Sequence, residues 1–245
     1  MNNKANRVAR FTSSDISVLM VNGNGPYGFG AGAITYINQK AMELEFGRGL
    51  SLPVNKWQMH WGNLWEVWVH WQLGNEYELV IDKTTIHPKY SFWSGSQDFN
   101  VSTLGGCIAE LKCYQMENHY KYTKCLQKQN VSLFKEKFAD EYWQIVSNSC
   151  IHNTKYGEAI AFLPTEENLI EMRQLIDETD YLEKHIKDDL FKYRFVVDRD
   201  LWDLPFIPSH SDFASMTKFR FEVPMDDKIA LIKRVIDANK LSNEL

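Results

Sequence analysis

The sequence predicts an α/β fold, and three observations lead to this expectation. The chain has 245 residues, 44% of them hydrophobic, which is enough to bury a large core in one domain. Segments with apolar residues at helical spacing alternate with short runs typical of strands. No repeat, low-complexity stretch or composition shift marks a boundary, so we expect a single domain over residues 1–245.

Helices are predicted where apolar residues recur at helical spacing after capping residues. A short helix should follow the cap-forming residues 12–15 and end near Met20. The helix at 31–46 should stop at Gly47. The core stripe of the next helix, 60–73, should consist of Trp61, Leu64, Trp65 and Trp68. The remaining helices are expected at 134–151, 166–177 and 225–241.

Strands and loops fill the intervening segments. Strands are expected at 76–81, 90–93, 98–101, 105–113, 157–163 and 190–197. The glycine-rich segment 22–30 lacks the Gly-Lys-Ser/Thr ending of a phosphate-binding loop, so we interpret it as a connector. A loop is expected at 50–57, and the polar segment 114–130 should be an exposed loop or a broken helix.

Composition excludes several classes of protein. No apolar run approaches the roughly 18 residues of a membrane-spanning helix, and no apolar segment typical of a secretory signal follows the N-terminus. The four cysteines show no CxxC spacing, which predicts a reducing cytoplasm and no zinc or iron–sulfur site. The net charge of −5 argues against a broad surface that coats nucleic acid, but it permits a nuclease with one basic channel.

The strand at 105–113 carries an unusual charged pair. It places Ile108, Glu110 and Lys112 on one face and only apolar residues on the other. Burying a carboxylate and an ammonium there is costly unless another group compensates them. Asp98, near the end of a neighbouring strand, would complete a site for a divalent cation and so indicates a metal-dependent hydrolase. The alternative is an exposed edge pair that contributes less than about 1 kcal/mol.

Further oxygen ligands for such an ion are available. Mg²⁺ prefers carboxylate, carbonyl and water oxygens. Asp98, Glu110 and the carbonyl of Leu111 would share one ion, and Glu66 would hold the same ion or a second. Bound in this way, Mg²⁺ would neutralise charge on a phosphodiester during hydrolysis.

Other polar residues would act on water and on phosphate. Lys112 would orient or activate the attacking water, and Gln144 would fix this lysine or a water. The hydroxyls at 12–14, with Arg7 and Arg10 nearby, form a candidate anion site at a helix N-terminus. The alternative there is an ordinary helix cap with solvated arginines.

The ordered set of motifs resembles the PD-(D/E)xK nuclease superfamily and, within it, the phage lambda exonuclease and viral recombinase family. The resemblance covers about residues 7–163. The matching motifs are Arg7 with Thr12-Ser13-Ser14, the helix end from Glu43 to Gly47, Trp61-Gly62-Asn63-Leu64-Trp65-Glu66, Ser96-Gln97-Asp98, Glu110-Leu111-Lys112-Cys113 and Glu141-Tyr142-Trp143-Gln144.

The chain departs from the family pattern at three places. Gln97 replaces a proline that is not a ligand, and Val146 stands where many members have a second glutamine. The insertion at 114–130 is longer than the family's connection, so it could reshape the channel or a subunit interface.

The resemblance implies a fold and a set of site residues. The fold is a restriction-endonuclease-like core over about 7–163, with a central mixed sheet flanked by helices, followed by a C-terminal strand and helices over 164–245. The implied metal ligands, for Mg²⁺ or Mn²⁺ as a substitute, are Glu66, Asp98, Glu110 and the Leu111 carbonyl. The implied catalytic residues are Lys112, Glu110, Asp98 and Gln144, the 5′-phosphate ligands are Arg7 and Ser14, and the duplex wedge is Met59.

The resemblance also implies an activity and partners. It implies a Mg²⁺-dependent 5′→3′ exonuclease that acts on double-stranded DNA ends and leaves 3′ single strands for phage-type recombination. A single-strand annealing protein, a ring-shaped homo-oligomer and the host cytoplasm, if a phage encodes the chain, are the implied partners and location. The alternatives are an endonuclease or single-strand nuclease of the same fold, and a non-catalytic DNA-binding protein on a nuclease fold that has lost its activity.

Overall fold

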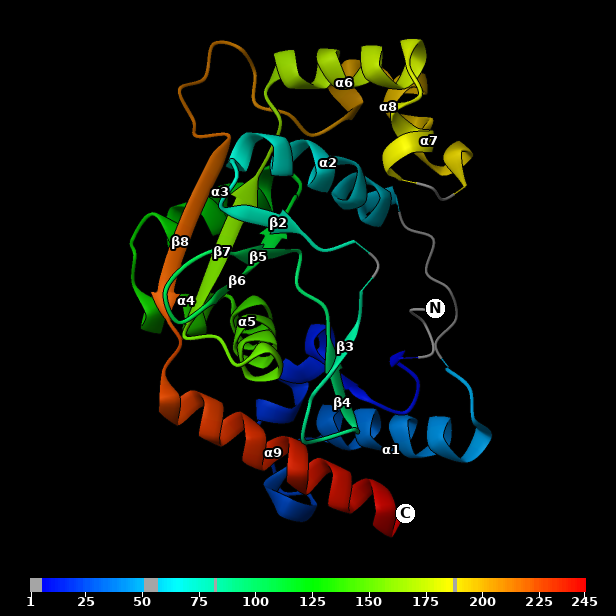
Figure 1. Ribbon diagram of the computed structural model, residues 1–245, viewed down its shortest axis with the longest axis vertical. Coiled ribbons are helices and arrows are strands. Elements are labelled where there is room, and N and C mark those ends of the chain that lie inside the picture. The colour runs from blue at the N-terminus through cyan, green and yellow to red at the C-terminus, as the bar shows by residue number, and fades with distance from the viewer. Residues whose placement is uncertain (1–5, 51–56, 82, 187–188) are drawn as a thin grey trace.

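The central sheet has five strands of mixed direction. The computed structural model describes residues 6–50, 57–81, 83–186 and 189–245, and the strand order of this sheet is β2-β5-β6-β7-β8 (Figure 1). Its strands are β2 Tyr77–Leu79, β5 Phe99–Val101, β6 Cys107–Lys112, β7 Tyr156–Phe162 and β8 Met216–Glu222. β6 and β7 pair in parallel, whereas the other neighbours are antiparallel. The predicted α/β fold with a mixed central sheet is confirmed.

A second, smaller sheet joins the N-terminal segment to the middle of the chain. It has the order β1-β4-β3 and consists of β1 Phe11–Thr12, β4 Trp93–Gly95 and β3 Thr85–Ile86. β1 pairs in parallel with β4, with Phe11 opposite Trp93 and Thr12 opposite Ser94. This pairing brings the residues that follow Arg7 close to the residues that precede Asp98.

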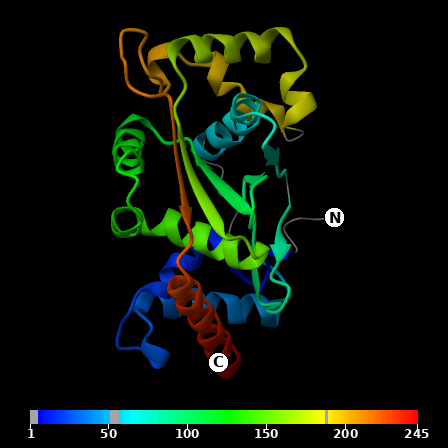
Figure 2. The ribbon, with the colours of Figure 1, turned by 60° about the vertical axis from the view of Figure 1, so that its left-hand side comes forward.

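Helices pack on both faces of the main sheet (Figure 2). One face carries α2 Trp57–Leu73, α6 Glu166–Glu178, α7 Tyr181–His185 and α8 Phe195–Asp198. The other carries the 3₁₀-helix η2 Ser13–Met20 with α1 Ala31–Phe46, α3 Met116–Leu126, α4 Val131–Lys137, α5 Ala139–His152 and α9 Met225–Glu244. Short 3₁₀ turns are η3 Pro26–Gly28, η4 Leu190–Tyr193 and η5 Leu201–Asp203. No helix in the described part of the chain is both long and apolar enough to cross a membrane.

The helix ends follow their local sequence. α1 stops at Gly47, which adopts the left-handed conformation with φ 63°, as expected for a C-terminal glycine cap. α6 starts after Thr165, whose hydroxyl accepts from the Asn168 N–H while the Asn168 side chain accepts from the Thr165 N–H.

The core beneath α2 is aromatic. The predicted stripe of Trp61, Leu64, Trp65 and Trp68 is buried, which confirms it. Trp65 and Trp68 each lie with ring centroids 5.4 Å from Phe162 of β7. α2 is therefore packed firmly against the sheet, which fixes the position of the other side chains it carries.

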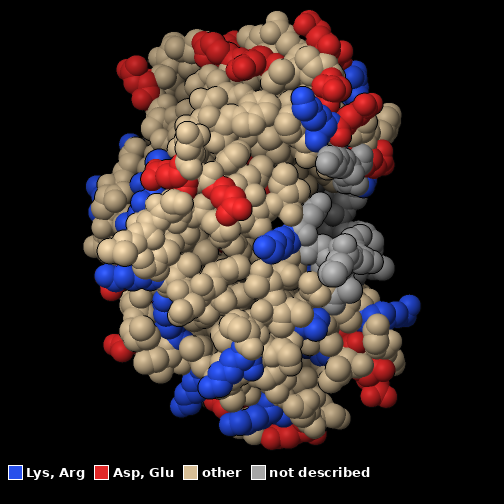
Figure 3. All heavy atoms as spheres, viewed as in Figure 1, with Lys and Arg blue, Asp and Glu red and all other residues tan. Residues whose placement is uncertain are grey.

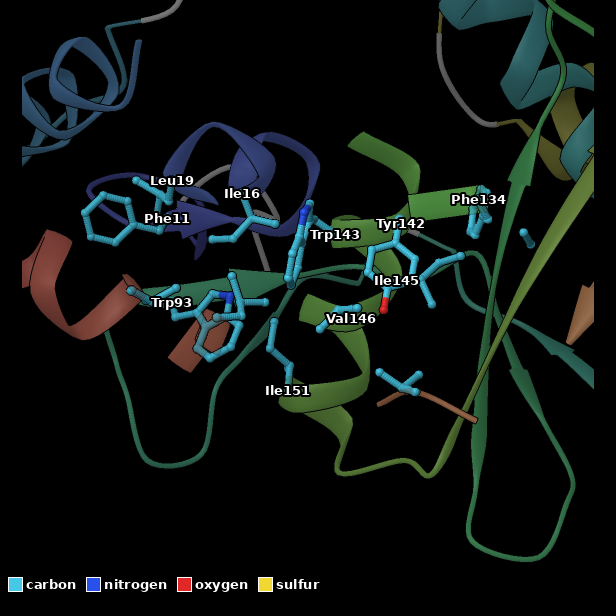
Figure 4. Packing of buried hydrophobic residues seen from close by; sticks show 14 of the residues in the cluster. Phe11, Ile16, Leu19, Trp93, Phe134, Tyr142, Trp143, Ile145, Val146 and Ile151 are labelled. Carbon is cyan, nitrogen blue, oxygen red and sulfur yellow. The ribbon is translucent and has the colours of Figure 1, made fainter. Parts of the chain in front are cut away.

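The core on the opposite face centres on α5 (Figure 4). Ile145 and Val146 of α5 are fully buried with Ile16 of η2 and Trp93 of β4. α5 can approach the sheet because β7 has a glycine at 157, where an added Cβ would lie 2.2 Å from Cγ2 of Ile145. This close packing fixes the height of α5 above β6.

Charge is distributed unevenly over the surface. On the face shown in Figure 3, Asp and Glu side chains gather at the end formed by α6 and α7, and Lys and Arg are more frequent over the lower half. The acidic end repels a polyanion, which would therefore approach the lower half of this face more favourably.

Several predicted elements need correction. The strand expected at 190–197 is wrong, because this segment forms η4 and α8, whose Tyr193 and Val196 are buried at helical spacing. The segment 114–130 is mainly the regular helix α3, and its buried Tyr122 and Leu126 lie one turn apart. Sequence reasoning also missed β8 and β3.

Other elements differ in their limits. The strand expected at 90–93 lies later, at Trp93–Gly95. The helix expected at 134–151 is two helices, α4 and α5, because Phe138 between them is not helical, with φ −135° and ψ 58°. Residues 51–56 of the loop expected at 50–57 lie outside the described residues.

The glycine under α5 gives a test of this packing. Gly157→Ala should lower the free energy of unfolding by about 1–3 kcal/mol, because the new Cβ overlaps Ile145. Gly32→Ala is the matched control, since a Cβ there meets nothing within 4 Å in α1, so stability should stay equal or rise by up to about 1 kcal/mol. Urea unfolding measures both, and equal stabilities of the two variants would contradict the close packing.

Candidate active site

The register of β5 and β6 places two carboxylates side by side. Phe99 lies opposite Ala109, and the Asp98 N–H donates to the Ala109 carbonyl at 3.2 Å. Asp98 therefore lies next to Glu110, the residue that follows Ala109. The Asp98 carboxylate accepts from the N–H of Leu111 at 2.6 Å, which fixes it against the end of β6.

Glu110 is buried and is held by two amides from α5. Its side chain accepts from Nε2 of Gln144 at 2.6 Å through one oxygen and from Nδ2 of Asn148 at 2.5 Å through the other. Gln144 and Asn148 are one helical turn apart, so they project from the same face of α5. Only 1% of Glu110 is exposed, so these bonds replace the water that its carboxylate loses.

Gln144 connects the acidic and basic groups of β6. Nζ of Lys112 donates to Oε1 of Gln144 at 2.9 Å, while the amide nitrogen of Gln144 donates to Glu110. A single amide thus holds the lysine and the carboxylate, which lie two residues apart on one strand face. The structure brings together Asp98, Glu110, Lys112 and Gln144 of the predicted site.

The electrostatics of this site leave negative charge uncompensated. Burial raises the pKa of Asp98, and the charge of Lys112 and the Leu111 N–H oppose this rise. Burial and then the charge of Asp98 raise the pKa of Glu110 well above its usual value, against Lys112 and the two amides. One ammonium beside the buried Glu110 and the half-buried Asp98 does not balance the two carboxylates, so a cation bound between them would be favoured.

The oxygen donors fit a hard cation. Asp98, Glu110 and the Leu111 carbonyl offer only oxygen atoms, as Mg²⁺ prefers. Glu66 projects from α2. Its negative charge acts on the same group as that of Asp98, because burial, then the charge of Asp98 and then the charge of Glu66 raise the pKa of the Cys113 thiol. Within the described residues, no three His, Cys, Asp or Glu side chains are close enough to hold a metal ion together. The structure thus places Asp98 beside Glu110, but it does not bring Glu66 close enough to share a metal ion with both carboxylates. The role of Glu66 stays a prediction.

A pocket of about 150 Å³ joins this site to the N-terminal segment. Nη2 of Arg7 donates to Oγ of Ser14 at 2.9 Å, and both residues line the pocket. The complete lining is Arg7, Thr12, Ser13, Ser14, Thr84, Gly95, Ser96, Asp98 and Gln144. The two predicted phosphate ligands therefore share one pocket with Asp98 and Gln144.

A second pocket, of about 450 Å³, is lined by Lys112. Met59, near the start of α2, lines it together with Leu111 and Lys112. The Met59 side chain is exposed, with 54% of its surface accessible. The predicted wedge residue thus stands at the mouth of a pocket that leads to the candidate catalytic lysine.

α5 ties this site to η2 and β4. Oγ of Ser147 lies 2.7 Å from Oγ of Ser13, and Nε1 of Trp93 donates to the same Ser147 oxygen at 2.9 Å. Gln144 and Asn148 come from the same helix. The carboxylates and the Arg7–Ser14 pocket are therefore positioned by one helix.

Sequence reasoning missed Asn148 and Gly95. Besides holding Glu110, Asn148 donates to the Ser96 carbonyl at 2.9 Å. Its position one turn after Gln144 was the signal that could have identified it. A Cβ at Gly95 would lie 2.1 Å from Oγ of Ser13 and 2.2 Å from Oδ1 of Asn148, so only glycine fits there.

The two single-residue departures from the motifs that the chain resembles lie in packed surroundings. Val146 is fully buried in the α5 core, in one cluster with Ile145 and Ile16. Gln97 is buried beside Asp98, and its Nε2 donates to Oδ1 of Asn100 at 2.7 Å. A glutamine side chain thus fits where the motif that the chain resembles has a proline, and it donates a hydrogen bond to a residue of β5.

The fold is similar to those of solved exonucleases. An alkaline exonuclease (LHK-Exo) from Laribacter hongkongensis superposes with a TM-score of 0.61 and 12% identity over 99% of this chain and 92% of that one. Its complex with dAMP gives a TM-score of 0.62 over 98% and 91% of the two chains, again with 12% identity. A phage-related exonuclease from Haemophilus somnus 129PT gives a TM-score of 0.58 and 10% identity over 96% and 94%.

The likeness is one of fold. No protein-family model and no curated protein sequence matches this chain. The three superpositions cover nearly the whole chain, including the C-terminal segment beyond residue 163, where the sequence motifs end. The chain therefore has the fold of these exonucleases over almost its full length.

Proposed function

We propose that this chain is a Mg²⁺-dependent 5′→3′ exonuclease that degrades linear double-stranded DNA and leaves 3′ single strands. The observation that carries the proposal is the 150 Å³ pocket in which Arg7 and Ser14 lie together with Asp98 and Gln144. A phosphate site inside the catalytic pocket favours attack at a strand terminus over attack within a duplex. We also propose that the chain belongs to the phage lambda exonuclease and viral recombinase family.

The residues of β5, β6 and α5 would divide the chemistry among them. Mg²⁺, or Mn²⁺ as a substitute, would be held by Asp98, Glu110 and the Leu111 carbonyl, with Glu66 as a further ligand, and would neutralise phosphoryl charge and polarise water. Lys112 would hold the attacking water or stabilise negative charge as it develops. Gln144 keeps Lys112 in place through the 2.9 Å hydrogen bond.

The N-terminal segment would select the DNA end. A terminal phosphate carries more negative charge than an internal diester, so the Arg7 guanidinium and the Ser14 hydroxyl would favour a 5′-phosphorylated strand. Met59 stands at the mouth of the second pocket beside Lys112, where an exposed apolar side chain would separate the terminal base pair. The acidic end at α6 and α7 would repel the DNA and so favour its binding over the lower half of the face in Figure 3.

The fold neighbours are consistent with this proposal. LHK-Exo is described as an alkaline exonuclease, and it has been crystallised with dAMP. A mononucleotide is the product that an exonuclease releases at each step. By the resemblance, we further propose that the remaining strand serves phage-type recombination in the host cytoplasm, with an annealing protein as partner and a ring of identical subunits as the assembly.

DNA topology gives the direct test of attack at ends. With Mg²⁺, the protein should degrade linear duplex and leave covalently closed circular duplex of the same sequence intact, because a circle offers no terminal phosphate to the Arg7–Ser14 pocket. Gel analysis of both substrates, and of a linear single strand of the same sequence, over time measures this. Equal cleavage of the circle would favour the endonuclease alternative, and cleavage of single strands alone would favour a single-strand nuclease.

Lys112→Ala is the control variant for this assay. It removes the ammonium that would act on water while leaving the Arg7–Ser14 pocket in place, so linear DNA should still bind without being hydrolysed. Wild-type turnover by this variant would refute the mechanism. Binding without hydrolysis by the wild type would instead support the non-catalytic alternative.

Asn148 should be required for turnover although it was absent from the sequence motifs. Asn148→Leu keeps the branched shape of the side chain but removes the N–H donors to Glu110 and Ser96, so kcat should fall about 10–100-fold with little change in KM. Ser149→Ala is the matched control, because Ser149 is buried next to it on α5 but donates to the Thr154 carbonyl instead. Steady-state kinetics on linear duplex measure both variants, and an unchanged kcat for Asn148→Leu would refute this role.

A further inference from the structure

We infer that Glu43 is a positioning residue for recognition of the 5′ end, because it fixes the turn from which Arg7 projects. The inference rests on the proposed function and extends it to a residue of α1 that lines neither pocket. Glu43 lies in the last turn of α1, and only 2% of it is exposed. A buried carboxylate at this position needs partners, and these partners reveal what it holds.

Both oxygens of Glu43 accept hydrogen bonds from several elements. Oε2 accepts from the N–H of Ala9 at 3.0 Å and from Nζ of Lys40 at 2.9 Å. Oε1 accepts from Nε2 of Gln39 at 3.1 Å and from the N–H of Leu50 at 3.4 Å. One side chain therefore joins the N-terminal turn to the segment that follows α1.

The Ala9 bond supports an unfavourable backbone conformation. The turn from Arg7 to Arg10 closes with the Arg10 N–H donating to the Arg7 carbonyl at 3.4 Å. Within it, Ala9 has φ 55°, in the left-handed region that a residue with a Cβ rarely adopts. The hydrogen bond from Ala9 to Glu43 holds this conformation and so fixes the direction in which Arg7 leaves the turn.

α1 makes a second contact that supports the same geometry. The N–H of Thr12 donates to the Tyr36 hydroxyl at 2.9 Å. α1 thus holds the chain at Ala9 and at Thr12. Arg7 lies two residues before Ala9, and Ser14 lies two residues after Thr12. This places the Arg7 guanidinium within 2.9 Å of the Ser14 hydroxyl.

The chemistry of Glu43 suits an anchor made of acceptors alone. Burial acts to raise its pKa, but hydrogen bonds from Lys40, Ala9 and Gln39 outweigh burial, so the pKa lies below its usual value. All four partners are donors. A leucine in its place would offer no acceptor, so the N–H of Ala9 would lose its bond together with the other three donors.

The experiment compares identical linear duplexes that carry a 5′-phosphate or a 5′-hydroxyl. The wild type should degrade the phosphorylated duplex faster, and Glu43→Leu should reduce this rate ratio by at least about tenfold, because the Ala9 N–H has no acceptor and Arg7 is no longer held in place. A merely structural role would lower both rates together and leave the ratio unchanged. Arg7→Ala gives the ratio expected when the guanidinium is absent.

Glu158→Leu is the matched control. Glu158 is also a carboxylate with 2% exposure, but its partners are Tyr77 and Arg220. This variant should lose stability yet keep the wild-type ratio. If Glu43→Leu fails to fold, Glu43→Asp replaces it, since it keeps the charge beside Lys40 but shortens the reach to Ala9 and should also lower the ratio.

The outcomes separate the inference from the proposed function. A wild type that degrades no linear DNA contradicts the proposed function itself. A wild type that prefers the 5′-phosphate, together with a Glu43→Leu variant that keeps this preference, overturns the inference alone. A Glu158→Leu variant that loses the preference equally would also overturn it.

Discussion

The buried carboxylate of Glu110 is the group on which the arrangement of the site depends. Its two oxygens accept hydrogen bonds from Gln144 and Asn148, so α5 must lie at one height and one rotation above β6. Gly157 permits that height by leaving room for Ile145. An unsatisfied buried carboxylate would be strongly unfavourable, and the packing of α5 is therefore coupled to the charge that it covers.

α5 also transmits this constraint to the N-terminal segment. Ser147, which lies between Gln144 and Asn148 in the sequence of α5, makes a hydrogen bond to Ser13. Asn148 donates to the Ser96 carbonyl. Ser13 and Ser96 both line the pocket that contains Arg7 and Asp98. Recognition of a strand end and hydrolysis would thus be aligned by the same helix, which explains why residues far apart in the sequence form one compact site.

Much of the fold and site could be predicted because the deciding signals are local. Strand alternation places Glu110 and Lys112 on one face, and helical spacing places Trp61 and Trp65 in the core. The errors arise where tertiary contacts decide. The apolar run at 190–197 becomes helical because it packs against α2, and Asn148 gains its role only when α5 meets β6. Ala9 and Glu43 interact across 34 positions, which no local pattern indicates.

If Mg²⁺-dependent hydrolysis starts at the 5′ end, the labels at the two ends of a strand must be released in a fixed order. Two linear duplexes of one sequence, labelled at the 5′ or the 3′ ends, are incubated with Mg²⁺ and, in parallel, with a chelator. We expect the 5′ label to appear first as mononucleotide, the 3′ label to stay on a long single strand, and the chelator to stop degradation of both duplexes. Earlier release of the 3′ label, or release that continues in the chelator, would contradict this expectation.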